Sequence, residues 1–243
     1  MFRNFLGRFV EPYQVSRIKT LIPFSHRVSK FLRLEFFGLN GIDRKVDSIL
    51  NKCSGFYVEL GANDGVNQSN TLFFERFKNW NGVLIEPHPQ TFERLKRNRS
   101  DRNFFKHAAC VSSEFERNSV EMAFSHLMTT TLEVETDLED QNMHAQKGSR
   151  FWRGQVYNFF APALTLSEIL DEAKAPYRID FLSLDVEGAE LEVLKGLDHK
   201  KYRFGLICVE SRDYLRINEY LMTYEYHLLM KISSHDYLFK DCS

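Results

Sequence analysis

Acidic residues stand at or next to the ends of four short apolar segments in this sequence. Segments this short, and this rich in aromatic and β-branched residues, are typical of buried strands. Carboxylates at strand ends can accept hydrogen bonds from ribose hydroxyls, take up a proton or bind a hard cation. The segments are FYVEL (56–60), GVLIE (82–86), DFLSLD (180–185) and FGLICVE (204–210), and their acids are Glu59, Glu86, Asp185 and Glu210.

The first of these segments runs into the stretch VELGANDG, from Val58 to Gly65. A glycine directly after a strand allows a tight turn, and a second glycine lets a ligand approach the backbone N–H groups of the next segment. Gly61 and Gly65 have this placement, but their spacing is not the G-x-G-x-x-G of a pyrophosphate-binding loop. Glu86, at the next strand end, is placed to accept both hydroxyls of a ribose. A nucleoside ligand such as S-adenosylmethionine fits this pattern.

Helical patterns separate the strand-like segments. QTFERLKRN (90–98), LTLSEILDEA (164–173) and GAELEVLKGL (188–197) have helical spacing or helix start and stop signals. Alternating strands and helices predict a parallel sheet with helices on both faces, which binds ligands beyond the carboxyl ends of its strands. The last two segments, 224–232 and 235–241, predict an antiparallel hairpin. The predicted fold is therefore α/β, a Rossmann-like doubly wound, mostly parallel sheet ending in an antiparallel C-terminal hairpin.

Composition excludes several classes of partner. The 243 residues carry a net charge of -1 and no basic stripe with aromatics near the predicted cleft, so we expect no nucleic-acid partner. No apolar run is long enough for a transmembrane segment, and the N-terminus lacks the apolar core of a secretory signal. The four cysteines lie far apart and are expected to be reduced thiols. These features favour a cytoplasmic protein.

Two regions depart from the strand and helix rhythm. Residues 1–40 form a basic and aromatic N-terminal segment that we expect to be helical, before the predicted α/β domain over 41–243. Three roles remain open for this segment: packing against the domain, contact with a second copy of the chain, or peripheral association with a membrane. Residues 113–158 form an insertion at a strand's carboxyl end, where a lid or substrate-selecting segment and a flexible loop are the two alternatives.

Several motifs together resemble the FkbM family of class I S-adenosylmethionine-dependent methyltransferases. They occur in the family's order from about Gly38 to Lys240, and the insertion is the weakest part of the match. The resemblance implies O-methylation of a hydroxyl on a sugar, a glycan or a polyketide product. The motifs are YVELGANDGVNQSNTLFFE, GVLIEPHPQTFERLKRNR, ALTLSEIL, IDFLSLDVEGAELEVLKGLD and HDYLF.

The resemblance also implies which residues bind the cofactor. The first loop would surround the methionine part, the start of the next helix would bind its carboxylate, the second strand end would hold the ribose and the third strand would lie beside the adenine. For Asp64, stabilisation of a turn is an equal alternative. In that order the residues are Glu59, Gly61, Ala62, Asn63, Asp64 and Gly65; Ser69, Asn70 and Thr71; Glu86 and Pro87; and His107 and Ala108, with Asp185 also facing the cofactor.

An alcohol acceptor must lose its proton during methyl transfer, which requires a base or a metal ion. Asp185 and Glu187 in LSLDVEGAELEVLKG are candidate catalytic residues, and with Glu210 they are candidate ligands of Mg2+. Compensation of a helix N-terminus is the structural alternative for Glu187. His235, oriented by Asp236 in HDYLFK, is a candidate general base, although a histidine at a turn is more often only solvated.

The leading hypothesis is an S-adenosylmethionine-dependent O-methyltransferase that acts on a sugar, glycan or glycoconjugate acceptor. One alternative is a scaffold for glycan assembly that binds an adenosyl ligand without catalysis. The other is a nucleotide-dependent oxidoreductase, against which the spacing of Gly61 and Gly65 argues.

Overall fold

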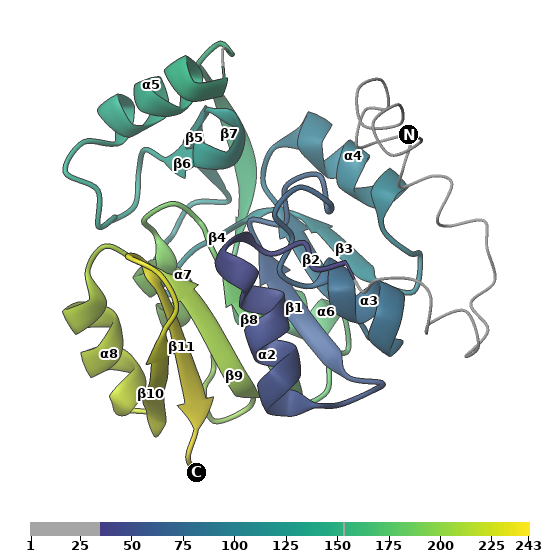
Figure 1. The fold of residues 1–243 in the computed structure, drawn as a ribbon. Coiled ribbons are helices and arrows are strands. Elements are labelled where there is room, and N and C mark those ends of the chain that lie inside the picture. The colour runs from purple at the N-terminus through teal and green to yellow at the C-terminus, as the bar shows by residue number, and fades with distance from the viewer. Residues whose placement is uncertain (1–34, 153) are drawn as a thin grey trace, which may run out of the picture. The chain divides into compact units, whose positions relative to one another are not determined.

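Seven strands form the main sheet of this computed structural model, which describes residues 35–152 and 154–243 (Figure 1). Their order is β10-β11-β9-β8-β1-β2-β3, and the pairs from β9 to β3 are parallel. Only β11 runs antiparallel to its two neighbours, β9 and β10. The strands are β1 (Phe56–Leu60), β2 (Asn81–Glu86), β3 (Phe104–His107), β8 (Arg178–Leu184), β9 (Arg203–Glu210), β10 (Tyr226–Lys231) and β11 (Asp236–Asp241).

Helices cover both faces of this sheet, and each face has its own apolar core. One core contains Val46, Phe73 and Leu95, and the other contains Leu170 and Leu194. The two sets of side chains come from different helices, as expected for strands that are buried on both faces. On the first face lie α2 (Ile42–Leu50), α3 (Leu72–Lys78) and α4 (Pro89–Asn98), and on the second lie α6 (Leu166–Glu172), α7 (Glu190–Lys195) and α8 (Tyr214–Met222).

The predicted doubly wound fold and its C-terminal hairpin are confirmed. Local signals fix several helix starts: Thr165 and Glu168 form a capping box before α6, and the Asp213 side chain accepts the Arg216 N–H at the start of α8. The predicted N-terminal segment lies outside the described residues, apart from residues 35–40, which include the start of η1 (Leu39–Gly41). Within the described part of the chain, no helix is long and apolar enough to cross a membrane.

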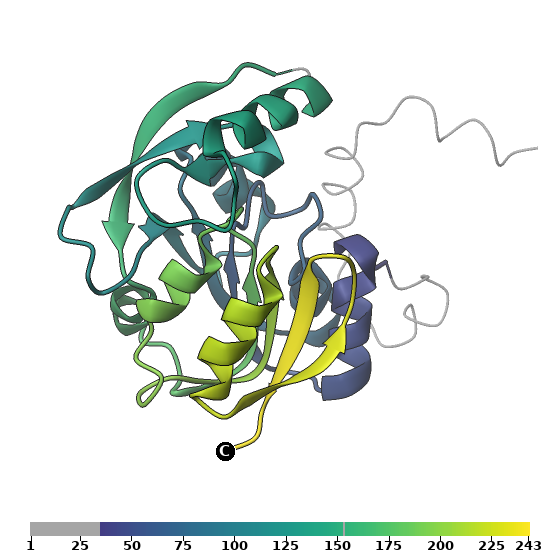
Figure 2. The ribbon, with the colours of Figure 1, turned by 90° about the vertical axis from the view of Figure 1, so that its left-hand side faces the viewer.

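A second sheet was not predicted from the sequence. The third strand, expected around His107 and Ala108, divides at Ala108. Strand β3 stays in the main sheet, whereas Ala109 and Cys110 pair with Ala163 and Leu164 in a sheet of order β4-β7-β5-β6. Figures 1 and 2 show this sheet and α5 together at one end of the main sheet. The additional elements are β4 (Ala109–Cys110), β5 (Ser119–Phe124), η2 (His126–Met128), β6 (Thr130–Thr131), α5 (Gln141–Trp152) and β7 (Tyr157–Leu164).

Candidate active site

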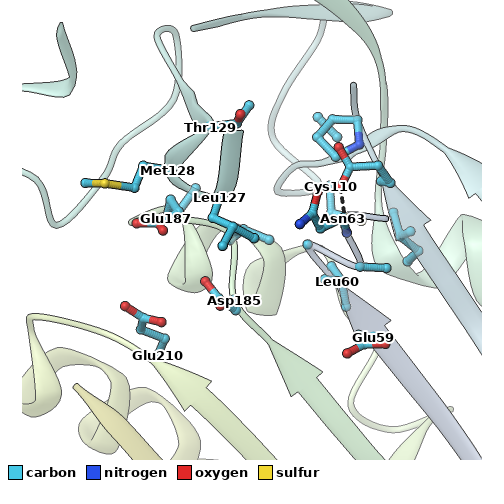
Figure 3. Close-up of a pocket in the computed structure, with 18 of the residues that line it drawn as sticks. Glu59, Leu60, Asn63, Cys110, Leu127, Met128, Thr129, Asp185, Glu187 and Glu210 are labelled. Atoms are coloured by element: carbon cyan, nitrogen blue, oxygen red, sulfur yellow. Dashed lines mark hydrogen bonds between the residues drawn. The ribbon is translucent and has the colours of Figure 1, made fainter. Parts of the chain in front are cut away.

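A cavity of about 400 Å³ opens at the carboxyl ends of the parallel strands. Its walls come from the ends of β1, β2, β8 and β9 and from the insertion (Figure 3). Most of the residues predicted from the sequence do line it, but six do not. The lining includes Glu59, Gly61, Ala62, Asn63, Ser69, Asn70, Glu86, Pro87, Ala108, Asp185, Glu187 and Glu210, and omits Asp64, Gly65, Thr71, His107, His235 and Asp236.

The two glycines of the first loop are required by the protein's own packing. Gly61 has φ +70°, and a Cβ there would lie 1.9 Å from the carbonyl oxygen of Asp185. Gly65 has φ +78°, and its Cβ would lie 2.6 Å from both Arg99 Cγ and Leu95 Cδ1. The sequence-based hypothesis that a ligand approaches both glycines is therefore corrected for Gly65, since a side chain fills that space. Gly61 keeps its place in the cavity wall and joins β1 closely to the end of β8.

Asp64 and Thr71 also have structural roles in place of the predicted cofactor contacts. The Asp64 carboxylate accepts the backbone N–H groups of Val66 and Asn67 at 3.0 and 2.8 Å, which is the turn-stabilising alternative. Thr71 is fully buried, and its hydroxyl donates to Glu59 at 2.6 Å. Neither residue lines the cavity.

Glu59 is the centre of a buried polar network behind the first loop. Its carboxylate accepts the Ser69 and Thr71 hydroxyls and the Asn70 backbone N–H, and it pairs with Arg99 Nη1 at 3.3 Å. Arg99 is itself buried and also donates from Nε to Glu75 at 2.8 Å. A buried carboxylate needs such partners. Glu59 therefore fixes the segment between β1 and α3, and its contact with the cavity is secondary.

Glu86 lies where the sequence predicts a ribose site. Its Oε2 accepts the Asn63 N–H and its Oε1 accepts the His88 N–H, both at 2.9 Å. Burial raises the pKa of Glu86 to about 7, although these two N–H donors oppose the rise. Each carboxylate oxygen has a second acceptor position. Glu86 can thus hold the first loop and accept two ligand hydroxyls at the same time.

Asn70 lines the cavity and has one unsatisfied polar atom, which lies next to Gly38. Its Nδ2 donates to the Ser183 hydroxyl at 3.0 Å, but its buried Oδ1 has no hydrogen-bond partner. A buried acceptor without a donor costs free energy unless a ligand supplies one. Asn70 Oδ1 is therefore a candidate acceptor for an ammonium group.

Asp185 and Glu210 form a pair at neighbouring strand ends. The register matches Leu184 with Val209, so the next residues of β8 and β9 face each other across the cavity floor. Burial raises the pKa of Asp185 well above the ordinary carboxylic acid range, and the charges of Glu210 and Glu187 add to the rise. Burial is also the main cause that raises the pKa of Glu210 to about 7, and the charges of Glu187 and Asp236 add to the rise. Two buried carboxyl groups whose charges act on each other titrate as one pair.

Glu187 is turned to other partners than a metal ion. Its Oε2 lies 3.2 Å from Arg212 Nη2 and 2.9 Å from His144 Nε2, and its carbonyl accepts the Thr130 hydroxyl at 2.9 Å. In the described part of the chain, no group of three or more His, Cys, Asp or Glu side chains is arranged to hold a metal ion. The predicted Mg2+ site of Asp185, Glu187 and Glu210 is therefore not supported, because the Arg212 guanidinium neutralises the Glu187 carboxylate.

The predicted His235–Asp236 base is not formed in the cavity. His235 is exposed in the hairpin turn, and the carboxylate of Asp236 accepts from Asn40 and from the Ser233 hydroxyl. Neither residue lines the cavity. His107 is also outside it, and its Nε2 donates to the Pro87 carbonyl at 2.8 Å. His107 therefore supports the wall at Pro87 without contacting the space inside.

Comparison with protein families identifies the architecture. A family model described as "Methyltransferase FkbM domain" matches residues 59–239, well over half of the chain. The chain belongs to the FkbM methyltransferase family. It is a methyltransferase, and S-adenosylmethionine is the methyl donor that the family implies.

Comparisons with individual proteins add less. The METTL16 methyltransferase domain matches with a TM-score of 0.45 and 10% identity, covering 84% of this chain and 69% of that one. Precorrin-6y C5,15-methyltransferase from Geobacter metallireducens matches with a TM-score of 0.42 and 12% identity, covering 81% and 85%. These scores are too low to indicate a substrate. A search of curated protein sequences found no match.

The FkbM domain has the groups that S-adenosylmethionine requires. Glu86 would hold the ribose hydroxyls, the unsatisfied Asn70 Oδ1 would accept from the ammonium group, and Ala108 would lie beside the adenine. Once bound, the cofactor supplies a methyl group activated by the positive charge on sulfur. These donor and acceptor groups would place the nucleoside on the β2 side of the cavity.

The insertion of the FkbM domain supplies cavity residues that sequence reasoning missed. Side chains from η2, from the loop after β6 and from α5 line the cavity: Leu127, Met128, Val134 and Phe151. In Figure 3, Leu127 lies between Asp185 and Asn63, and Met128 lies on the Glu187 side. Leu127 and Met128 in HLMTTTL (126–132) are apolar residues in a stretch that the sequence suggested was a loop. Their presence there was the one sequence signal of a contact with the cavity.

Proposed function

We propose that this FkbM methyltransferase transfers the methyl group of S-adenosylmethionine to a hydroxyl of a sugar, glycan or glycoconjugate. The observation that carries the proposal is the Asp185–Glu210 carboxyl pair on the floor of the same cavity as Glu86. An alcohol oxygen attacks the methyl carbon in line with the breaking carbon–sulfur bond, and its proton must leave during attack. A carboxylate with a raised pKa is suited to take that proton at neutral pH.

Asp185 is the general base in this proposal. It lines the cavity at the end of β8, whereas His235 lies outside it. The acceptor hydroxyl donates its proton to Asp185, and the neighbouring charge of Glu210 favours the protonated form of Asp185. The products are the methyl ether, S-adenosylhomocysteine and the proton held by the pair.

Two measurements test the proposal against its alternatives. Calorimetric titration with S-adenosylhomocysteine, with NAD in parallel, should give binding of the first alone; preference for NAD would indicate an oxidoreductase. Labelled methyl transfer from S-adenosylmethionine to a panel of glycosides should then give an alkali-stable methyl ether. Asp185→Asn should keep most of the cofactor affinity and lose turnover, whereas binding without turnover by the unmodified protein on every acceptor would favour a scaffold.

A further inference from the structure

The charge of the cavity lining disfavours anionic acceptors, because the described residues that line the cavity include no lysine and no arginine. They do include five acidic residues: Glu59, Glu86, Asp185, Glu187 and Glu210. Arg212 reaches Glu187 from outside the lining and is held by Glu187 and Asp137. Glu59 is paired with Arg99 in the same way. Asp185 and Glu210 form no salt bridge within the described part of the chain, so a phosphate or carboxylate placed against them would meet like charge. Like-charge contacts cost several kcal/mol at an interface.

Apolar side chains form the wall above these acids. Leu127 and Met128 of η2 reach over the floor where Asp185 and Glu187 lie (Figure 3). The nucleoside has an apolar wall of its own on the β2 side, where Ala108 lines the same cavity. Leu127 and Met128 are therefore available to contact the acceptor.

The turn that carries this wall is fixed from behind. The Ser125 hydroxyl donates to the Ala145 carbonyl at 2.6 Å, and the Ser125 N–H donates to the Thr129 hydroxyl at 3.0 Å. A Cβ on Gly148 of α5 would lie 2.3 Å from Ser125 Oγ and 2.8 Å from Met128 Cβ. Such direct packing of α5 on the turn makes Leu127 and Met128 a preformed surface, and preformed apolar surface near a few polar groups is the usual character of a substrate site.

We propose that the acceptor is an uncharged polyol joined to an apolar group, with the hydroxyl at Asp185 and the apolar group against Leu127 and Met128. The proposal rests on the methyltransferase function proposed above and narrows its substrate class. Neutral glycosides with an alkyl, aryl or lipid aglycone meet both requirements. Free sugar phosphates, uronic acids and nucleic acids do not.

The test uses three glycosides that separate the effect of a negative charge on binding from the effect of apolar contact. Protein saturated with S-adenosylhomocysteine is titrated with octyl β-glucoside, octyl β-glucuronide and methyl β-glucoside, all below the concentration at which micelles form. Burial of several methylene groups should make octyl glucoside bind at least about tenfold tighter than methyl glucoside. The anionic glucuronide should bind at least about tenfold weaker than octyl glucoside.

Two variants locate the binding. Leu127→Asn should remove most of the advantage of the octyl chain, and Leu215→Asn, an exposed leucine on α8 outside the cavity lining, should leave it unchanged. Equal binding of the glucuronide, an equal effect of both variants or no binding of octyl glucoside would each overturn the inference. Failure of S-adenosylhomocysteine to bind in the first step would instead overturn the proposed function, so the two failures are distinct.

Discussion

The positive charge of the methyl donor should change the protonation of the Asp185–Glu210 pair. S-adenosylmethionine and S-adenosylhomocysteine differ by one methyl group and the charge that it places on sulfur. Burial raises the pKa of both carboxyl groups of the pair. A cation next to the pair favours its fully ionised form and lowers its upper pKa. Binding of the donor should therefore release a proton that binding of the product does not.

The size of this effect follows from the number of protons that the pair holds. One added positive charge beside the pair should displace at most one proton from it, so the difference between the two ligands lies between zero and one proton. Donor affinity relative to product affinity should then rise with pH, by up to about tenfold per pH unit around the upper pKa of the pair. Glu187 and Asp236, which also face the pair, keep that pKa raised, while Arg212 opposes them.

Calorimetry in buffers of different ionisation enthalpy counts the protons directly. Each ligand is titrated in two buffers at neutral pH, and the change of binding enthalpy with buffer enthalpy gives the protons released. Glu86, whose pKa is raised to about 7 by burial, contacts the part that both ligands share, so its contribution cancels in the difference. Asp185→Asn should abolish the difference. Equal proton release for both ligands in the unmodified protein would refute the reasoning, because the pair would then not sense the reacting sulfur.

Three further predictions test single contacts. Glu86→Gln should weaken S-adenosylhomocysteine binding by about 1–3 kcal/mol at pH 8 in calorimetry. In the unmodified protein, the affinity should fall as the pH drops below about 7, because the ribose hydroxyls bond to the ionised form of Glu86. An affinity that does not change with pH would contradict the ribose assignment. Gly61→Ala should lower the free energy of unfolding in urea by clearly more than the control Gly41→Ala, which should cost about 1–2 kcal/mol. Both glycines have positive φ, but only at Gly61 would a Cβ clash with the backbone. Equal losses of stability would contradict a role of that clash. His235→Ala should leave cofactor affinity and turnover unchanged, since His235 is exposed outside the cavity, and a large loss of turnover would restore it as the base.

Strand ends were the part of the site that the sequence could predict. Glu86 and Asp185 follow short apolar runs, and parallel strands bring their carboxyl ends to one edge, so the position of each acid follows from local pattern alone. The role of Glu59 does not follow from local pattern, because its partner Arg99 is 40 residues away at the end of α4. Gly65 was misread for the same reason, since the side chain beside it is also that of Arg99. Contacts that join distant segments decide which residues near a loop remain available to a ligand.

The insertion was beyond sequence reasoning for a different reason. Its strands β4 and β6 are two residues long, and such pairs have no periodicity to detect. Their sheet depends on pairing with β7, which lies more than 20 residues from each of them in the chain. Only the break in rhythm was visible, and it predicted a decoration without showing that η2 would reach the cavity.

Three acids at neighbouring strand ends have two physical interpretations, and the surrounding charges distinguish them. Ligands of a hard cation need to point their oxygens at one empty position, and Glu187 instead points at Arg212 and His144. Among the described residues, Asp185 and Glu210 form no salt bridge, and burial together with like charge raises their pKa values. Proteins retain such unfavourable groups where function requires them. A methyl donor that binds with a positive charge on sulfur relieves this repulsion. The donor loses that charge on methyl transfer, and the pair gains the acceptor's proton in the same step. The total charge of the pair and the sulfur is therefore the same before and after the reaction.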